Sequence, residues 1–332
     1  MSATVIQSGF CCCAVAALLC GSAASGNEAA LAESGLRIVE DAASGRLTIT
    51  DGSKPVLTYN FNTVPVPAGV TGIYAVARSN YVHPLYGPEG EVLTKDYSPD
   101  HPHHRGIYWA WPELTWKGDK RDLHALQGVF ARPLRIVRKD VSNGSALIEA
   151  ENVWKWGDTE AVVRELAKIV VSQDKDQRRT IDFEFQFQAL VEGLTLARRE
   201  MANYGGFNMR LSARDKQTIL THIADPATNP RAAWACLAGI PPDGKQPVSV
   251  AILQPATNPE YPGDWVQYPD LNWLQPTFPS QGTRYELTPG KTLVLRYRLV
   301  VFYGEADAAL LQRLWTDYAG VTAPTPATSE AK

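Results

Sequence analysis

The sequence predicts an all-β protein: one large antiparallel β-sandwich, supersandwich-like in size, with a single C-terminal helix. The clearest evidence lies at residues 181–188, where Ile and Phe alternate with Asp, Glu and Gln, as in a strand with one buried and one polar face. A second observation is Asn143-Gly144 between two apolar runs, the strongest short signal for a hairpin. About a dozen strand-like runs with turn residues between them, and no internal repeat, complete the case.

The expected strands follow one another along the whole chain. Val, Ile, Thr and aromatic residues dominate them, and Gly, Asn, Asp and Pro separate them. The run at 161–171 also contains helix formers, but its β-branched residues favour a strand. We place strands at 36–39, 47–50, 56–61, 73–78, 81–86, 92–97, 107–111, 130–138, 146–153, 161–171, 180–188, 204–211, 248–253 and 292–303.

One helix is expected at 305–318, because its apolar residues recur at helical spacing. Residues 113–127 are predicted to be a polar connection. Residues 254–279 are long for a connection and rich in Pro, Asn and Trp, so we expect them to shape a pocket. A single domain would span 30–318, followed by a disordered tail at 320–332 that is rich in Ala, Pro and Thr.

The N-terminal segment predicts export. The apolar run 10–19 and the small residues at 23–25 are typical of a signal peptide at 1–25, so N-terminal sequencing of the mature protein should start near Gly26, in the periplasm or outside the cell. Whether Cys20 carries a lipid stays open. Later apolar runs are too short for a transmembrane anchor, and a net charge of −3 gives no basic surface for nucleic acid. Cys236 is the one cysteine beyond the signal, and its apolar neighbours predict a buried structural thiol.

The candidate site is the stretch Asp100–Trp111, in which His101, His103 and His104 stand close together. Five of the 6 histidines of the chain fall between residues 83 and 124. Imidazole is the side chain best suited to proton transfer and metal ligation near neutral pH. This segment is therefore the first place to expect chemistry. The ordinary alternative, in which the histidines only satisfy backbone groups of a loop, also stays open.

The backbone of this stretch decides whether its histidines can act together. On a regular strand His103 shares a face with Arg105, whereas His104 shares the opposite face with Gly106. A common pocket for both histidines therefore requires an irregular backbone, which Pro102 and Gly106 can provide. Gly106 is also expected to leave open space for a ligand.

Several motifs resemble the PmoA-like family, commonly labelled "methane oxygenase PmoA", over residues 55 to 304. They are His83-Pro84-Leu85-Tyr86, residues 100–106, Tyr204-Gly205-Gly206 with Arg210, residues 255–265 and Leu295-Arg296-Tyr297-Arg298. The chain lacks the apolar runs of an integral membrane subunit, so the label does not imply methane oxidation. The β-rich pattern is also similar to galactose-mutarotase-like sandwiches, which act on sugars with histidine and carboxylate groups.

These resemblances suggest roles for the site residues. A histidine would act as general acid or base and an arginine would bind a substrate oxygen, so the catalytic candidates are His103, His104, Arg105 and His83. Asp100 or Glu200 would orient an imidazole or serve as the second acid/base group. Tryptophan faces, about half of them expected in the core, would stack on a sugar ring. The expected substrate-binding residues are Asp100, His101, Tyr108, Trp109, Tyr204, Arg210, Asn258 and Trp265.

Three functions are compatible with these residues. The leading one is an exported carbohydrate-processing enzyme with acid/base chemistry on a small sugar or sugar derivative. The second is a metal-dependent, oxygenase-like enzyme in which His83, His101 and His103 hold a divalent metal, so the cofactor stays open. The third is a non-catalytic sugar-binding protein, which would keep its affinity for sugar after the loss of a single histidine.

Overall fold

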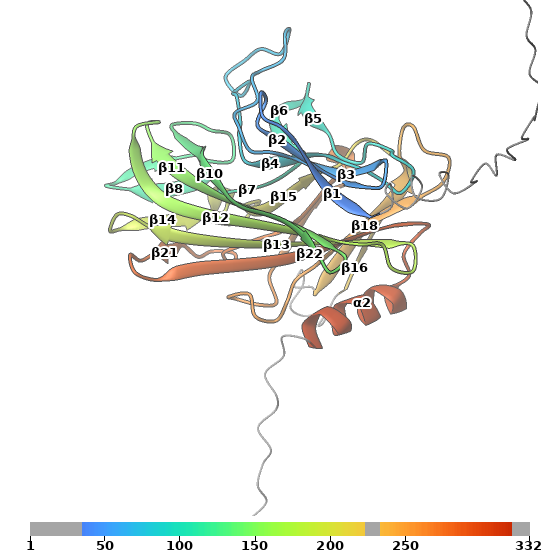
Figure 1. The fold of residues 1–332 in the computed structure, drawn as a ribbon. Coiled ribbons are helices and arrows are strands. Elements are labelled where there is room, and N and C mark those ends of the chain that lie inside the picture. The colour runs from blue at the N-terminus through green and yellow to red at the C-terminus, as the bar shows by residue number, and fades with distance from the viewer. Residues whose placement is uncertain (1–34, 223–232, 321–332) are drawn as a thin grey trace, which may run out of the picture. The chain divides into compact units, whose positions relative to one another are not determined.

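The computed structural model describes residues 35–222 and 233–320. The expected signal peptide and C-terminal tail lie outside these residues, apart from Gly320, which ends the helix. Within the described part the fold is all-β with one C-terminal α-helix, so the predicted fold class is confirmed. Two eight-stranded sheets form the sandwich, and a four-stranded and a two-stranded sheet flank them (Figure 1).

The first large sheet carries the strands that lead to the histidine stretch. Its neighbours pair antiparallel. In spatial order the strands are β1 (Leu36–Asp41), β2 (Arg46–Asp51), β3 (Lys54–Asn60), β4 (Tyr81–Leu85), β7 (Ile107–Ala110), β15 (Gly206–Arg210), β20 (Trp273–Pro276) and β19 (Trp265–Tyr268).

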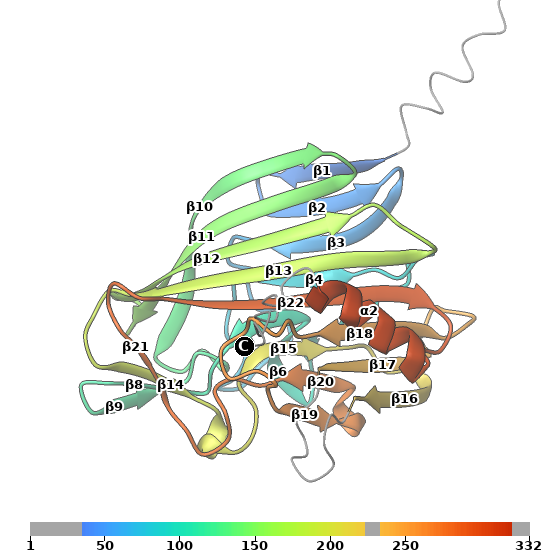
Figure 2. The same cartoon turned by 90° about the horizontal axis from the view of Figure 1, so that it is seen from below.

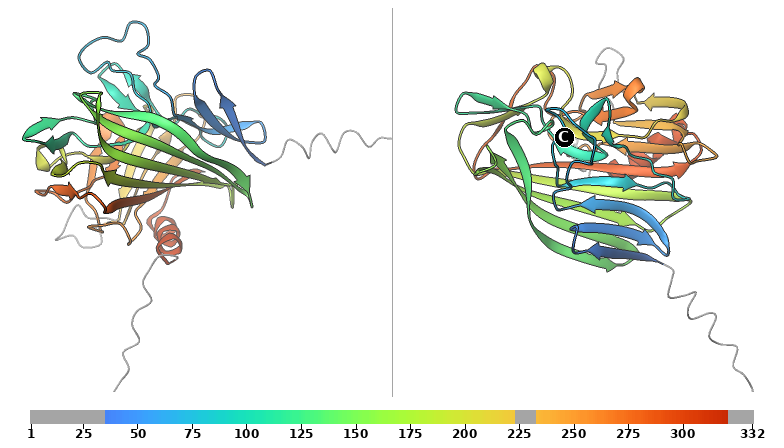
Figure 3. Two further views of the ribbon diagram at one scale, coloured as in Figure 1. Left: turned by 60° about the vertical axis from the view of Figure 1, so that its left-hand side comes forward. Right: turned by 90° about the horizontal axis from the view of Figure 1, so that it is seen from above.

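The second large sheet contains the longest strands and is also antiparallel. Seen from above, the blue N-terminal strands lie across its green strands (Figure 3). In spatial order the strands are β10 (Val129–Ser142), β11 (Ser145–Trp156), β12 (Glu160–Ser172), β13 (Arg178–Ala189), β22 (Thr292–Tyr303), β18 (Val248–Leu253), β17 (Trp234–Ile240) and β16 (Asp215–Thr221).

Two small sheets and two 3-10 turns complete the elements of the described residues, apart from the C-terminal helix. The four-stranded sheet runs β21 (Tyr285–Leu287), β14 (Leu194–Ala197), β8 (Glu113–Trp116) and β9 (Asp119–Arg121). The two-stranded sheet pairs β5 (Asp96–Ser98) with β6 (His101–Arg105). The 3-10 turns are η1 (Arg199–Met201) and η3 (Pro269–Leu271).

The core lies between the two large sheets. The alternation along β13 is as predicted, because Ile181, Phe183 and Phe187 are buried on its inner face with Phe185. The ring of Phe185 lies 4.1 Å from the ring of Trp109 on β7, centroid to centroid, so the two sheets meet there. Burial of these large apolar side chains is the main stabilising contribution to the sandwich.

A carboxylate stands inside this apolar core. Glu165 of β12 is fully buried. It accepts hydrogen bonds from Trp109 Nε1 at 2.7 Å, Trp154 Nε1 at 2.6 Å and Asn80 Nδ2 at 2.6 Å, with Asn152 Nδ2 at 3.4 Å. Burial raises the pKa of Glu165, and the four donors oppose that rise. The carboxylate thus joins β12, β11 and β7 through polar contacts across the sandwich.

The helix α2 (Ala308–Gly320) begins later than predicted. The side chain of Asp307 accepts a hydrogen bond from the backbone N–H of Leu310 at 2.6 Å, which caps the helix start and accounts for the shift from residue 305. The helix covers the outer face of β17, β18 and β22, where Leu311 packs with Trp234 and Val300 (Figure 2). In the described part of the chain, no helix has the length and apolar character to cross a membrane.

Local predictions were right at the hairpin and wrong at two connections. Asn143 and Gly144 adopt positive φ values of 50° and 70° between β10 and β11, as a two-residue hairpin turn requires. Cys236 is buried on β17, as predicted. Residues 73–78 form no strand beyond a bridge at Arg78, whereas the expected connection 113–127 contains β8 and β9.

Candidate functional site

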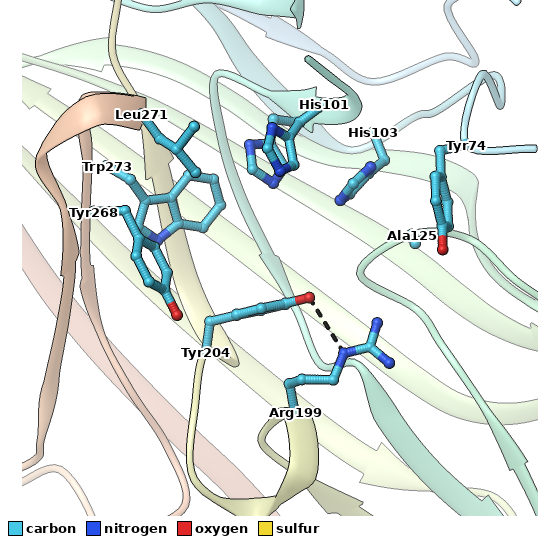
Figure 4. A pocket seen from close by; sticks show the side chains of 10 residues that line it. Tyr74, His101, His103, Ala125, Arg199, Tyr204, Tyr268, Leu271 and Trp273 are labelled. Carbon is cyan, nitrogen blue, oxygen red and sulfur yellow. Dashed lines mark hydrogen bonds between the residues drawn. The ribbon is translucent and has the colours of Figure 1, made fainter. Parts of the chain in front are cut away.

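A pocket of about 380 Å³ lies on the side of the first sheet that faces away from the second sheet. Trp109 points into the core, so its neighbour Tyr108 points the other way and lies beneath the pocket. Aromatic rings and histidines form the walls (Figure 4). The lining residues are Tyr74, His101, His103, His104, Ala125, Arg199, Tyr204, Tyr268, Leu271 and Trp273.

A bulge in β6 directs two adjacent histidines into the same pocket. Asp96 of β5 is opposite Arg105, and Ser98 is opposite His101, so β6 advances four residues while β5 advances two. Two extra residues therefore interrupt the regular alternation between these pairs. The irregular backbone that a shared pocket requires is present, and His103 and His104 both line the cavity.

Gly106 separates β6 from β7 and has a different role from the one expected. Its φ of +63° lies in the left-handed region, and a Cβ there would stand 2.3 Å from the carbonyl oxygen of Val82 and 2.9 Å from Cβ of His83. The expected open space for a ligand is therefore wrong, because the backbone of β4 occupies it. Glycine is required here for a close approach of two chain segments.

Four imidazoles form a tight cluster at the floor of the pocket. The rings of His101 and His104 are stacked with centroids 4.6 Å apart, and those of His103 and His104 are also 4.6 Å apart, edge to face. His124 joins them at 5.4 Å from His103 and 5.6 Å from His104. The segments that precede and follow β7 in the sequence thus bring together four of the 6 histidines of the chain.

Polar contacts hold some of these rings in place. Asp100 accepts a hydrogen bond from Arg210 Nη2 at 2.8 Å and lies 3.0 Å from His101 Nδ1. Arg210 Nη1 donates to His104 Nδ1 at 3.3 Å. His124 Nε2 lies 2.9 Å from the hydroxyl of Tyr108. The predicted substrate-binding residues Asp100, Arg210 and Tyr108 therefore contact the histidines but do not themselves line the pocket.

Two imidazole nitrogens in the cluster have no protein partner within the described ranges. Nδ1 of His103 and Nδ1 of His124 are buried and make no hydrogen bond. A buried polar nitrogen without a partner is uncommon and costs free energy. The ring of His103 lines the pocket and can contact a bound ligand, whereas its Nδ1 is closed off from the cavity.

Three histidines of the cluster, His103, His104 and His124, are held neutral. Burial, reinforced by the charge of Arg78, lowers the pKa of His103 to about 3. Burial and the neighbouring His103 lower the pKa of His104, and burial lowers the pKa of His124 well below its ordinary value. Neutral imidazoles offer lone pairs, so they can accept protons or hydrogen bonds from a ligand.

These shifts predict a loss of stability in acid. The unfolded chain protonates His103 near its ordinary pKa of 6.5, whereas the folded chain does so only near 3. The unfolded state therefore binds more protons between these values, and the free energy of unfolding should fall as the pH decreases from about 6.5 toward 3. Urea denaturation across this range should show a shallower fall for His103→Ala; an unchanged slope would contradict the assignment.

An arginine and a tyrosine form the opposite wall. Arg199 Nε donates to the Tyr204 hydroxyl at 3.2 Å (Figure 4). Arg199 Nη2 donates to Asp122 at 3.0 Å. The phenolic oxygen of Tyr204 accepts the first of these hydrogen bonds from the guanidinium. The hydroxyl proton of Tyr204 therefore remains available for donation to a ligand. Asp122 orients Arg199, so this wall presents a positive edge and a hydroxyl together.

Arg105 and His83, two of the four catalytic candidates, lie outside this pocket. Arg105 is fully buried, pairs through Nε with Asp96, donates from Nη2 to the Tyr81 hydroxyl at 2.5 Å and stacks on Tyr97 at 3.5 Å. It therefore holds β5 and β6 together. His83 bonds through Nδ1 to Thr94 at 2.9 Å and lines a separate groove.

Three other candidate ligand-binding residues have structural positions. Trp109 donates to Glu165 in the core, as described above. Asn258 bonds the backbone of Arg296 through both its side-chain nitrogen and oxygen, at 2.7 and 2.8 Å, which anchors its loop to β22. Trp265 is buried in the main core. Glu200 is exposed on η1 and does not line the pocket, so of the two carboxylates only Asp100 contacts the histidines.

The structure adds residues that sequence reasoning did not select. His124 was visible as part of the histidine concentration but lay in a segment taken for a polar connection. Arg199 is the residue before Glu200, which the sequence suggested as an acid/base group. Tyr268 belongs to the long 254–279 segment, which was expected to shape a pocket and does so. Trp273 of the same segment was among the tryptophans expected to offer a stacking face, and it does line the pocket. Tyr74 lies where a strand was expected.

The predicted metal ligands do not come together. His83 faces a different groove from His101 and His103. Across residues 35–222 and 233–320, no three side chains of the His, Cys, Asp and Glu types are arranged to hold a metal ion. Arg78 and Arg210 also lower the pKa of His103 by their charge, and the same charges would repel a cation.

Comparison with known proteins shows weak structural likenesses. A putative kojibiose phosphorylase from the human microbiome is 8% identical with a TM-score of 0.36, over 84% of this chain and 32% of that one. The α-galactosidase AgaA from Geobacillus stearothermophilus is 9% identical with a TM-score of 0.36, over 81% and 41%. The heparan sulfate lyase HepC from Pedobacter heparinus is 8% identical with a TM-score of 0.34, over 83% and 36%. The chain spans about a third to two fifths of the length of these proteins.

No curated protein matches this sequence. A family description does match, and it covers the sandwich from the second strand into the helix, residues 46–316. It includes every residue that lines the histidine pocket. Because the match spans most of the sequence, the chain belongs to the family of unknown function DUF6807.

Proposed function

We propose that this protein is an exported carbohydrate-processing enzyme that binds one sugar unit in the histidine pocket and carries out proton transfer on it. The observation that carries this proposal is the combination of aromatic walls with a floor of neutral imidazoles in one open cavity. Export rests on the sequence of residues 1–25, which lie outside the described residues.

The size and walls of the pocket suit a small sugar. Its volume of about 380 Å³ falls within the range of roughly 300–1,000 Å³ that small-molecule sites occupy. Tyr268 and Trp273 form one side and Tyr204 lies across the opening from His103 (Figure 4). Aromatic faces favour the C–H faces of a sugar ring, while imidazole and phenol groups bond its hydroxyls.

Proton transfer would use groups on opposite walls. His103 is neutral and its ring lines the pocket, so its imidazole can accept a proton from a substrate hydroxyl. Tyr204 can donate its hydroxyl proton, and Arg199 would stabilise the negative charge left on its oxygen.

A non-catalytic sugar-binding protein is the second candidate. The same aromatic walls favour it, since they bind a sugar whether or not a proton moves. The two functions differ in the effect of losing His103: a binding protein keeps its task, whereas an enzyme binds sugar and fails to convert it.

Truncating an aromatic wall tests sugar binding directly. Tyr268 is half-buried at the pocket, so Tyr268→Ala should weaken binding of a pocket sugar about tenfold by removing a stacking surface. The measurement is isothermal titration calorimetry against a panel of monosaccharides. Tyr285→Ala is the matched control, because Tyr285 is also half-buried but packs on Phe278 away from the pocket. Equal affinities for wild type and Tyr268→Ala, or no binding of any sugar, would refute the proposal.

A further inference from the structure

We propose that the sugar bound in this pocket carries a carboxylate, as a uronate does, and that Arg199 binds that carboxylate. This inference rests on the proposed function, because it names the substrate class of the same site. It follows from the charges around the histidines and from the donors that Arg199 leaves unused.

The charges around the pocket leave one positive charge unbalanced. Arg199 pairs with Asp122 at 3.0 Å and Arg210 pairs with Asp100 at 2.8 Å. Arg78 is buried and donates to two backbone carbonyl oxygens, and no carboxylate of the described residues lies within ion-pair distance of it. Three guanidinium groups, Arg78, Arg199 and Arg210, are thus matched by two carboxylates, Asp100 and Asp122, beside neutral histidines. A buried excess charge is costly unless a ligand offsets it.

Arg199 is the guanidinium placed to meet the ligand. Arg78 and Arg210 are nearly fully buried, whereas the Arg199 side chain is 36% exposed and lines the pocket. Its bonds to Tyr204 and Asp122 use two of the five N–H donors of a guanidinium. The remaining donors can bind a carboxylate in the paired geometry that arginine favours.

A monoanion fits this arrangement better than a dianion. One unbalanced positive charge matches one carboxylate, whereas a phosphate ester would bring a second negative charge with no cation to offset it. The aromatic side formed by Tyr268 and Trp273 remains available for the ring of the same sugar. A uronate therefore satisfies both walls at once.

A bound carboxylate would also prepare His103 for proton transfer. Burial is the main reason that the pKa of His103 is low, and the charges of Arg78 and Arg199 lower it further. An anion beside Arg199 would offset that charge and move the pKa of His103 upward, toward the range in which a histidine is an effective base. Substrate binding would thereby increase the basicity of the group that acts on it.

The test compares neutral and acidic sugars of the same shape. Calorimetry should show that glucuronate or galacturonate binds about tenfold more tightly than glucose or galactose at low ionic strength, with the difference shrinking in high salt. Arg199→Gln should abolish this preference, so that acidic and neutral sugars bind the variant with equal affinity. Arg199→Lys, which keeps the charge, should retain part of it.

A control variant separates this effect from net charge. Arg132 also pairs with a carboxylate, Asp158 at 2.7 Å, and stacks on Phe130, but it lies outside the pocket, so Arg132→Gln should keep the preference. Equal binding of acidic and neutral sugars would overturn the inference and leave the proposed function standing. Tighter binding of glucose 6-phosphate than of either uronate would overturn the choice of a carboxylate. Binding of no sugar at all would overturn both proposals.

Discussion

Replacing His103 with alanine is expected to lower the turnover of the pocket sugar by about 100-fold or more, the usual scale for a lost general acid or base. The residue lines the cavity, and its buried Nδ1 makes no protein hydrogen bond within the described structure. Removing it therefore takes away a proton acceptor without breaking a polar contact at that atom. Affinity for the sugar should change little, because the aromatic walls remain. Proton NMR of sugars incubated with each variant would follow the conversion.

The control for His103→Ala is His222→Ala. His222 is half-buried and lies against Trp234, with ring centroids 5.4 Å apart, away from the pocket. The same substitution there should leave turnover unchanged. Normal turnover by His103→Ala together with a large drop in melting temperature would show instead that the histidine is structural, which is the ordinary alternative raised by the sequence.

Replacing Glu165 with leucine is expected to destabilise the fold by about 3–5 kcal/mol, as is typical when a buried charged group is removed from its partners. The carboxylate receives N–H donors from Trp109, Trp154 and Asn80, and none of these can reach water from the core. Each donor left unsatisfied costs about 1–3 kcal/mol. Urea denaturation would measure the loss as a lower midpoint.

Two further variants define the origin of that loss. Glu165→Gln keeps one acceptor oxygen and should fall between wild type and Glu165→Leu. Glu184→Leu removes a partly exposed carboxylate that pairs with Arg296 at 2.7 Å, and a pair of this kind contributes only about 0–1 kcal/mol. A Glu165→Leu protein as stable as wild type would mean that the tryptophan donors do not depend on this carboxylate.

The strands were predictable wherever side-chain alternation or a turn signal marked them. Residues 248–253 and 292–303 form β18 and β22 with the predicted bounds, and the 180–188 run lies within β13. A strand was wrongly predicted at 73–78, because the segment has a β-forming composition but finds no partner strand along its length. Strand pairing is a long-range interaction, so the composition of a short segment cannot show whether a partner strand will lie beside it.

The site was predictable as a location but only partly as a set of residues. The concentration of histidines identified β6, and His101, His103, His104 and Tyr204 do line one pocket. Arg105 is adjacent in sequence and yet faces elsewhere, because the bulge ends at its pairing with Asp96. Arg199 and Trp273 come from distant segments that only the folded chain brings near. The catalytic roles, and the resemblance to the PmoA-like family, stay predictions.

The position of β22 has a consequence for how the protein is made. This strand pairs with β13 on one side and β18 on the other, so it joins the two halves of the second sheet although it is the last strand of the described residues. During synthesis, β10–β13 and β16–β18 emerge long before it and carry unpaired inner edges until residues 292–303 follow. Folding of that sheet is therefore completed only after β22 has left the ribosome. Throughout that interval the nascent protein would depend on protection from association with other chains through those edges.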